Sequence, residues 1–121
     1  MKTRKSTTAA GPDDYPRCNA TTRGGVPIYW TPRDWTYDCS LYPTSGRRSA
    51  RDQAAVKALQ RSLRWCNGGS RVTIDGWFGP QTEAALKRVQ RRVGATVDGW
   101  YGPETRKKMS HFLKRGRRRS T

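Results

Sequence analysis

Ile74-Asp75-Gly76-Trp77-Phe78-Gly79-Pro80-Gln81-Thr82 is the stretch that decides the fold. It returns 23 residues later (97 − 74) as Val97-Asp98-Gly99-Trp100-Tyr101-Gly102-Pro103-Glu104-Thr105. Each copy reads as an apolar anchor, an Asp-Gly turn, two aromatic residues and a Gly-Pro-x-Thr helix start. Glycine in the turn permits the positive φ that other residues resist. The repeat therefore predicts two units, each a turn followed by a bulky apolar plug and a new helix.

Three amphipathic helices are predicted around these turns. Apolar residues recur at three- and four-residue spacing after residue 51, after Pro80 and after Pro103. Asn67-Gly68-Gly69 is expected to end the first helix, and Gly94 the second. The expected core residues are Val56, Leu59 and Leu63 in the first helix, Ala85, Leu86, Val89 and Val93 in the second, and Met109, Phe112 and Leu113 in the third.

The residues before and after the helices have a different composition. Residues 15–48 interleave aromatic residues with prolines, which predicts an extended arm with little regular structure apart from an edge strand at 26–30. A disordered basic tail at 1–14 and a basic C-terminal tail at 115–121 flank the arm and a helical domain at 49–114. The arm aromatics either pack on their own domain or dock on a partner protein. The docking candidates are Tyr29, Trp30, Trp35, Tyr37 and Tyr42.

Charge and length limit the classes of protein. The chain has 121 residues, 33% of them hydrophobic, and 25 Lys and Arg against 9 Asp and Glu give a net charge of +16. One modest core is expected, together with attraction to polyanions such as teichoic acid or nucleic acid. No run is long and apolar enough to span a membrane, and the N-terminus lacks the apolar segment of an export signal. The electrostatic candidates are Arg64, Lys87, Arg91, Lys114, Arg115, Arg117, Arg118 and Arg119.

Three cysteines allow one disulfide. We expect a Cys39–Cys66 bridge that ties the arm to the first helix and leaves Cys18 inert, or else three reduced thiols.

Catalytic chemistry is not expected. The single histidine, His111, is predicted to be solvated on the terminal helix, and one histidine does not supply a zinc site or a nucleophile–base pair. Asp75 and Asp98 are expected to bond within their turns, so no acid and base pair of carboxylates is recognisable. We therefore expect no enzyme, no metal and no cofactor.

The motifs resemble a known family. Val56-x-x-Leu59-Gln60-x-x-Leu63, the two Asp-Gly-x-aromatic-Gly turns and Val89-Gln90 stand in the order and spacing of the peptidoglycan-binding domain type 1, over roughly residues 50–113. The resemblance implies a mainly α, three-helix fold that targets the bacterial cell wall without catalysis. The Arg- and Trp-rich composition of this segment is similar to that of family members from actinobacteria and their phages. Valine stands at position 89, where the family usually has phenylalanine.

The turns are the expected ligand site. Trp77 and Trp100 either stack on sugar rings or pack against the core and the arm. The candidate residues for glycan and stem peptide are Trp77, Trp100, Tyr101, Asp75, Asp98 and Arg71. We expect a peptidoglycan-binding component of a phage virion, docked through residues 15–48 on a capsid or tail protein, located on the virion surface or at the cell wall. The alternatives are a basic structural or cement protein that contacts protein or nucleic acid, and an exported bacterial wall-binding protein.

Overall fold

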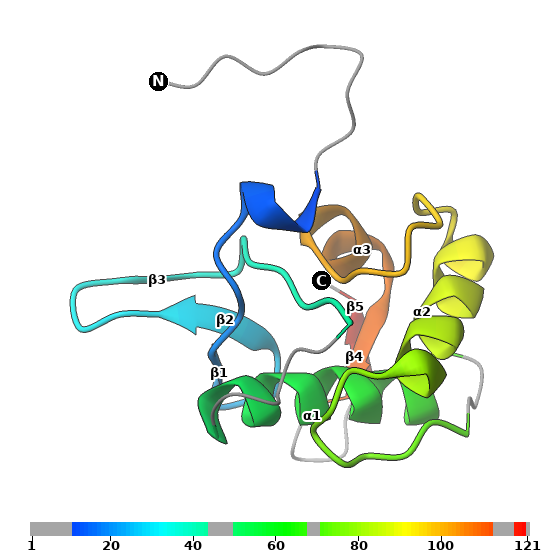
Figure 1. The fold of residues 1–121 in the computed structure, drawn as a ribbon, viewed down its shortest axis with the longest axis horizontal. Coiled ribbons are helices and arrows are strands. Elements are labelled where there is room, and N and C mark those ends of the chain that lie inside the picture. The colour runs from blue at the N-terminus through cyan, green and yellow to red at the C-terminus, as the bar shows by residue number, and fades with distance from the viewer. Residues whose placement is uncertain (1–10, 44–49, 68–70, 113–117, 121) are drawn as a thin grey trace, which may run out of the picture.

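The computed structural model describes residues 11–43, 50–67, 71–112 and 118–120. A small antiparallel sheet precedes three helices, and a second strand pair follows them (Figure 1). The elements are η1 (Pro12–Asp14), β1 (Ala20–Thr21), β2 (Pro27–Trp30), β3 (Trp35–Thr36), α1 (Ala50–Trp65), α2 (Pro80–Val93), α3 (Pro103–Lys108), β4 (Ser110–Phe112) and β5 (Arg118–Ser120). The three predicted helices are present, but the whole fold is mixed rather than mainly α.

The first two helices follow their sequence patterns. Val56, Leu59 and Leu63 are buried on α1, and α2 buries Ala85, Leu86 and Val89. Gly94 ends α2 in the left-handed conformation with φ 79°, which explains why a glycine stands there. Both plugs of the repeat, Phe78 and Tyr101, are fully buried.

The third helix is shorter than predicted. It ends at Lys108, and Met109 is already extended. Both polar atoms of the Asn67 side-chain amide bond the backbone of Ser110, donating to its carbonyl at 2.8 Å and accepting from its N–H at 3.0 Å. This pairing replaces helical hydrogen bonds, so Phe112 lies in strand β4 rather than on a helix. Leu113 lies outside the described residues.

The arm contains regular structure, contrary to the prediction. Its three strands form an antiparallel sheet in the order β1-β2-β3, and β1 and β2 pack on α1. The predicted strand at 26–30 exists, but β2 is the middle strand rather than an edge. Pro27 is tolerated because it is the first residue of the strand. The β2–β3 hairpin projects away from the helices (Figure 1).

The disulfide joins Cys18 to Cys39, with 5.0 Å between their Cα atoms. The predicted Cys39–Cys66 bridge and the inert Cys18 are therefore wrong. The reason is backbone pairing between two separate segments of the arm: Cys18 N–H donates to the Ser40 carbonyl and Ser40 N–H to the Pro16 carbonyl, each at 2.9 Å. This pairing brings positions 18 and 39 together, whereas Cys66 is buried at the end of α1 and forms no disulfide.

The arm and the helices share one core. Leu41 and Tyr101 exchange backbone hydrogen bonds of 2.9 and 2.7 Å, which joins the arm to the second copy of the repeat. Cys18, Cys39 and Leu41 are fully buried in the same cluster as the apolar residues of α1 and α2. Residues 15–43 are thus part of the folded body. In the region assigned to the N-terminal tail, Pro12–Asp14 forms η1, and residues 1–10 lie outside the described residues.

His111 is buried in β4, so the prediction of a solvated histidine is wrong. Its Nε2 lies 3.0 Å from the Tyr101 hydroxyl. Burial raises the pKa of Tyr101, so this phenol stays protonated. The strand, rather than the predicted helix, turns the histidine inward.

Acid is expected to destabilise the protein through His111. Burial, together with the nearby Arg106 cation, lowers the pKa of His111 from 6.5 to about 4. Between these pH values the unfolded chain binds a proton that the folded chain does not. The stability contribution is therefore complete above pH 6.5 and is lost as the pH falls toward 4. We expect the free energy of unfolding to fall by about 2 kcal/mol between about pH 7.5 and about pH 5.

Urea unfolding at both pH values measures this loss. The His111→Gln variant is the control, and its loss over the same range should be about 2 kcal/mol smaller. Equal losses in the variant and the wild type would contradict the assignment to His111.

Candidate functional site

A buried glutamine from α1 holds the first Asp-Gly turn. The Gln60 amide nitrogen donates to the Asp75 carboxylate and the Trp77 carbonyl, each at 3.0 Å. It also lies 3.0 Å from the Thr82 hydroxyl at the start of α2. Gln60 Oε1 accepts from the backbone N–H groups of Asp75 and Gly76 at 3.1 and 2.9 Å. One side chain therefore fixes both the turn and the start of the next helix.

Gln90 on α2 does the same for the second turn. Its amide nitrogen lies 2.8 Å from the Asp98 carboxylate and 3.0 Å from the Trp100 carbonyl. It lies 3.1 Å from the Thr105 hydroxyl. Its Oε1 accepts from Asp98 and Gly99 N–H at 3.2 and 3.0 Å. Asp75 and Asp98 also accept the N–H of the residue two positions on, at 3.0 and 3.3 Å, which confirms their predicted role in the turns.

The internal repeat extends back into the helices. Residues 53–63, QAAVKALQRSL, align with residues 83–93, EAALKRVQRRV, 30 positions later (83 − 53). The molecule thus contains two helix-and-turn units. The helical half of the repeat is not visible at the spacing of the turns, because the helices are displaced by 30 residues and the turns by 23. Seven extra residues between α1 and its turn cause the difference.

The ring of each turn tryptophan lies against the glycine that stands two positions later in the chain. A Cβ atom built on Gly79 would lie 2.8 Å from ring carbons of Trp77, and one built on Gly102 would collide with the Trp100 ring. Glycine is therefore required at both positions so that the indole can lie flat against the backbone. The Trp77 side chain remains 41% exposed, and Trp100 is half-buried.

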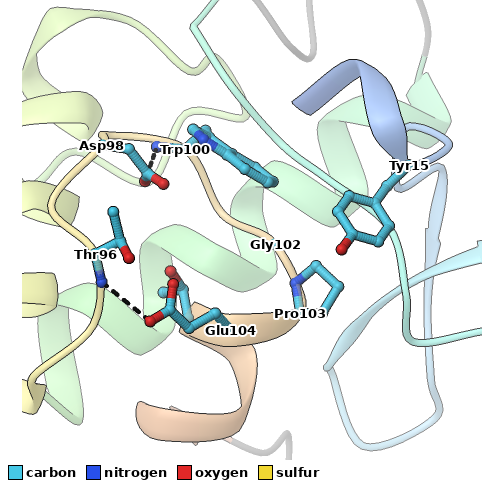
Figure 2. A pocket seen from close by; sticks show the side chains of 8 residues that line it. Tyr15, Thr96, Asp98, Trp100, Gly102, Pro103 and Glu104 are labelled. Atoms are coloured by element: carbon cyan, nitrogen blue, oxygen red, sulfur yellow. Dashed lines mark hydrogen bonds between the residues drawn. The ribbon is translucent and has the colours of Figure 1, made fainter. Parts of the chain in front are cut away.

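The second turn forms part of a pocket of about 90 Å³ (Figure 2). The Tyr15 ring, from the arm, lies 6.2 Å from the Trp100 ring, centroid to centroid. Pro103 adds an apolar surface below the two rings in this view (Figure 2). The lining residues are Tyr15, Thr96, Asp98, Trp100, Gly102, Pro103, Glu104 and Thr105.

The opposite side of the pocket is polar and acidic. Glu104 Oε2 accepts the Thr96 N–H at 3.3 Å and lies 3.4 Å from the Lys108 ammonium. Hydrogen bonding from Thr96 and the Lys108 charge lower the pKa of Glu104, so it is ionised at neutral pH. Asp98 is exposed beside it. The pocket thus pairs aromatic faces with hydrogen-bond acceptors, in a chain whose net charge is strongly positive.

The structure places the predicted ligand residues in different surroundings. Trp100 and Asp98 line the pocket, whereas Trp77 and Asp75 belong to the other turn. Tyr101 was expected to contact ligand, but it is fully buried between Leu41 and the core, so that prediction is wrong. Arg71 is exposed and does not line this pocket.

Among the electrostatic candidates, Arg64 and Arg91 are exposed. Lys87 is half-buried and pairs with Glu83 at 3.8 Å. Lys114, Arg115 and Arg117 lie outside the described residues. Arg118 and Arg119 belong to β5, which pairs with β4.

The arm aromatics divide into two groups. Tyr29 packs against the core, the Tyr37 ring lies 5.0 Å below the Arg106 guanidinium, and the Tyr42 hydroxyl accepts a 2.6 Å hydrogen bond from Arg17. Contacts within the folded chain hold all three tyrosines in place. Trp30 and Trp35 are 39% and 48% exposed at the hairpin.

Sequence reasoning gave no site role to Tyr15, Thr96 or Glu104. Tyr15 lies 85 residues from Trp100 (100 − 15), so only the fold brings the two rings together. The glutamines had a visible signal, since Gln60 and Gln90 each follow an apolar residue at the same place in the aligned helices.

Comparison with known families identifies the helical part. Residues 52–109 match the family model described as "Putative peptidoglycan binding domain". This segment belongs to the peptidoglycan-binding domain family, as the motifs predicted. In comparisons with curated proteins and with solved structures, nothing matches the chain significantly.

The family and the disulfide together indicate an extracellular or cell-wall location. Within the described residues, no helix has the length and apolar character needed to cross a membrane.

Proposed function

We propose that this protein binds peptidoglycan without chemically altering it, and that the pocket at the second turn is its main contact. The observation that carries the proposal is the pairing of Trp100 with Tyr15 in a pocket that also contains Asp98 and Glu104, at the second turn of the segment that matches the peptidoglycan-binding family. Aromatic faces with a few placed polar groups are typical of small-ligand sites.

The size of the pocket suggests which part of the wall it takes. At about 90 Å³ it is far smaller than the several hundred Å³ of a site that encloses a whole ligand. One substituent of a sugar fits better than a whole ring. An N-acetyl group matches this site, because its methyl group can lie against Trp100 and Pro103 and its N–H can donate to Glu104 or Asp98.

The state of the titratable groups supports the proposal of a non-catalytic role. His111 is buried beside Tyr101, away from the pocket, and its pKa is too low for it to act as an acid at neutral pH. Asp98 accepts hydrogen bonds within its own turn, and Glu104 is held ionised by Thr96 and Lys108. Glu104 is therefore not suited to donate a proton, and Asp98 serves to hold its turn.

The positive charge supplies a weaker and less selective contribution. A net charge of +16 attracts teichoic acid and nucleic acid alike, and this attraction falls as salt rises. Contact with such polyanions is therefore an accessory proposal, as is use of the fold as a basic cement protein. Display on a phage particle is a separate proposal that rests on the Arg- and Trp-rich composition of the sequence. Mass spectrometry of purified particles tests it.

Co-sedimentation with sacculi stripped of teichoic acid tests the proposed function. At high salt we expect Trp100→Ala to weaken binding by on the order of 10-fold or more, because a buried aromatic anchor contributes about 2 kcal/mol. Tyr15→Ala should weaken binding as well. Tyr15→Phe should not, because the ring, and not the hydroxyl, forms one side of the pocket.

Trp65→Ala is the matched control, because Trp65 is 48% exposed at the end of α1 and does not line the pocket at the second turn. It should bind as the wild type does. If the wild type itself leaves the stripped sacculi at high salt, binding is electrostatic and the proposed function is wrong.

A further inference from the structure

The placement of the tryptophans is the starting observation. None of the five belongs to the buried core cluster, although large aromatic residues are on average well buried. Two of them, Trp30 and Trp35, face each other across the β2–β3 hairpin. They stay 39% and 48% exposed in a chain that has few apolar residues for its core.

The tip of this hairpin is rigid. Backbone bonds of 2.8 and 3.2 Å join Thr31 and Asp34 in both directions. The Thr31 hydroxyl donates to the Asp34 carbonyl and accepts from two backbone N–H groups. The Asp34 carboxylate accepts the Trp35 N–H at 2.7 Å. A tip fixed in this way presents its side chains without a large loss of entropy on binding.

A second pocket, of about 160 Å³, lies at this tip. Tyr29 and Trp35 supply aromatic surface, and Thr31, Asp34 and Thr36 complete the lining. Aromatic side chains thus line this pocket as well as the one at the second turn. The mainly apolar lining suits the C–H face of a sugar ring stacked on an aromatic side chain.

The hairpin is fastened to the element that carries the first pocket. The Trp35 ring meets the Tyr37 ring edge-on at 5.1 Å, and Tyr37 lies against Arg106 of α3. Arg106 also bonds the Asp38 carboxylate at 3.5 Å. Pro103, at the start of α3, lines the pocket at the second turn. The two pockets are therefore held on connected, packed elements.

We propose that the hairpin tip is a second saccharide subsite, and that the ligand is the glycan strand itself, bound at two separate points. This inference rests on the proposed function and names the part of peptidoglycan that is recognised. Two weak subsites engaged by one polymer bind far more tightly than either alone, because the second contact is intramolecular. Short fragments that reach one pocket should bind weakly, and long strands strongly.

Glycan strands freed of stem peptides and sorted by length are the probe, with affinity measured by calorimetry. The wild type should bind long strands on the order of 100-fold more tightly than the disaccharide. The Trp30→Ala/Trp35→Ala double variant should lose this gain and keep the disaccharide affinity. Trp65→Ala, the control for loss of an exposed indole, should keep both. Circular dichroism and melting temperature verify that each variant is folded.

The outcomes separate the two proposals. If the double variant still binds long strands more tightly than the disaccharide by the full factor, the hairpin subsite is wrong. The hairpin would then be a candidate for docking a protein. In that case binding lost only in Trp100→Ala still supports the proposed function. If stem-peptide fragments bind and bare strands do not, the glycan inference is overturned while wall binding stands. If no fragment binds the wild type, both proposals fail.

Discussion

Replacing Gln90 by alanine is expected to lower the free energy of unfolding by about 4 kcal/mol. The side chain is fully buried and bonds the backbone or side chains of Asp98, Gly99, Trp100 and Thr105. Each buried group left without a partner costs about 1–3 kcal/mol, and several are left at once. Urea unfolding of the variant measures the loss.

Gln53→Ala is the control for this substitution, because Gln53 is exposed on α1. Its effect should stay within about 0.5 kcal/mol. Gln90→Glu keeps the shape of the side chain but removes the N–H donors and places a second carboxylate 2.8 Å from Asp98. It should be severely destabilised near neutral pH. A Gln90→Ala variant as stable as Gln53→Ala would show that the turn is held by other contacts.

Loss of the Cys18–Cys39 disulfide is expected to cost about 3 kcal/mol. The bridge closes a segment with a sequence separation of 21 residues, and a closed loop of this size restricts the unfolded chain by about that amount. The double Cys18→Ala/Cys39→Ala variant should melt well below the wild type in a thermal scan. Because Tyr15 lies close before Cys18, wall binding should weaken as the arm loosens.

A reductant gives the matched control. It should lower the melting temperature of the wild type and leave that of the double alanine variant unchanged. If the reductant shifts both proteins equally, it acts elsewhere, and the contribution assigned to the disulfide is wrong.

The parts of the fold that sequence could predict are those encoded locally. The nine-residue repeat, the helix end at Gly94 and the buried apolar residue Phe78 each depend on residues that are neighbours in the chain. The turn roles of Asp75 and Asp98 follow from the same local chemistry. These features were predicted because turn and cap preferences act over a few residues.

The remaining features depend on pairing between distant segments. Cys18 meets Cys39 because residues 17 and 40 form a parallel bridge, and no spacing rule selects that pair among three cysteines. His111 is buried because Asn67 draws Ser110 into an extended conformation. Half of the candidate site was invisible for the same reason, since Tyr15 reaches Trp100 only when Leu41 has joined Tyr101.

The Leu41–Tyr101 pairing has a consequence for recombination between proteins. The family match begins at residue 52, between these two partners, so a segment cut there would carry Tyr101 without Leu41 and the pocket without Tyr15. A segment that keeps the pocket complete has to include Tyr15. For this chain, the segment that can be exchanged between proteins with its pocket intact is therefore longer than the segment that matches the family model.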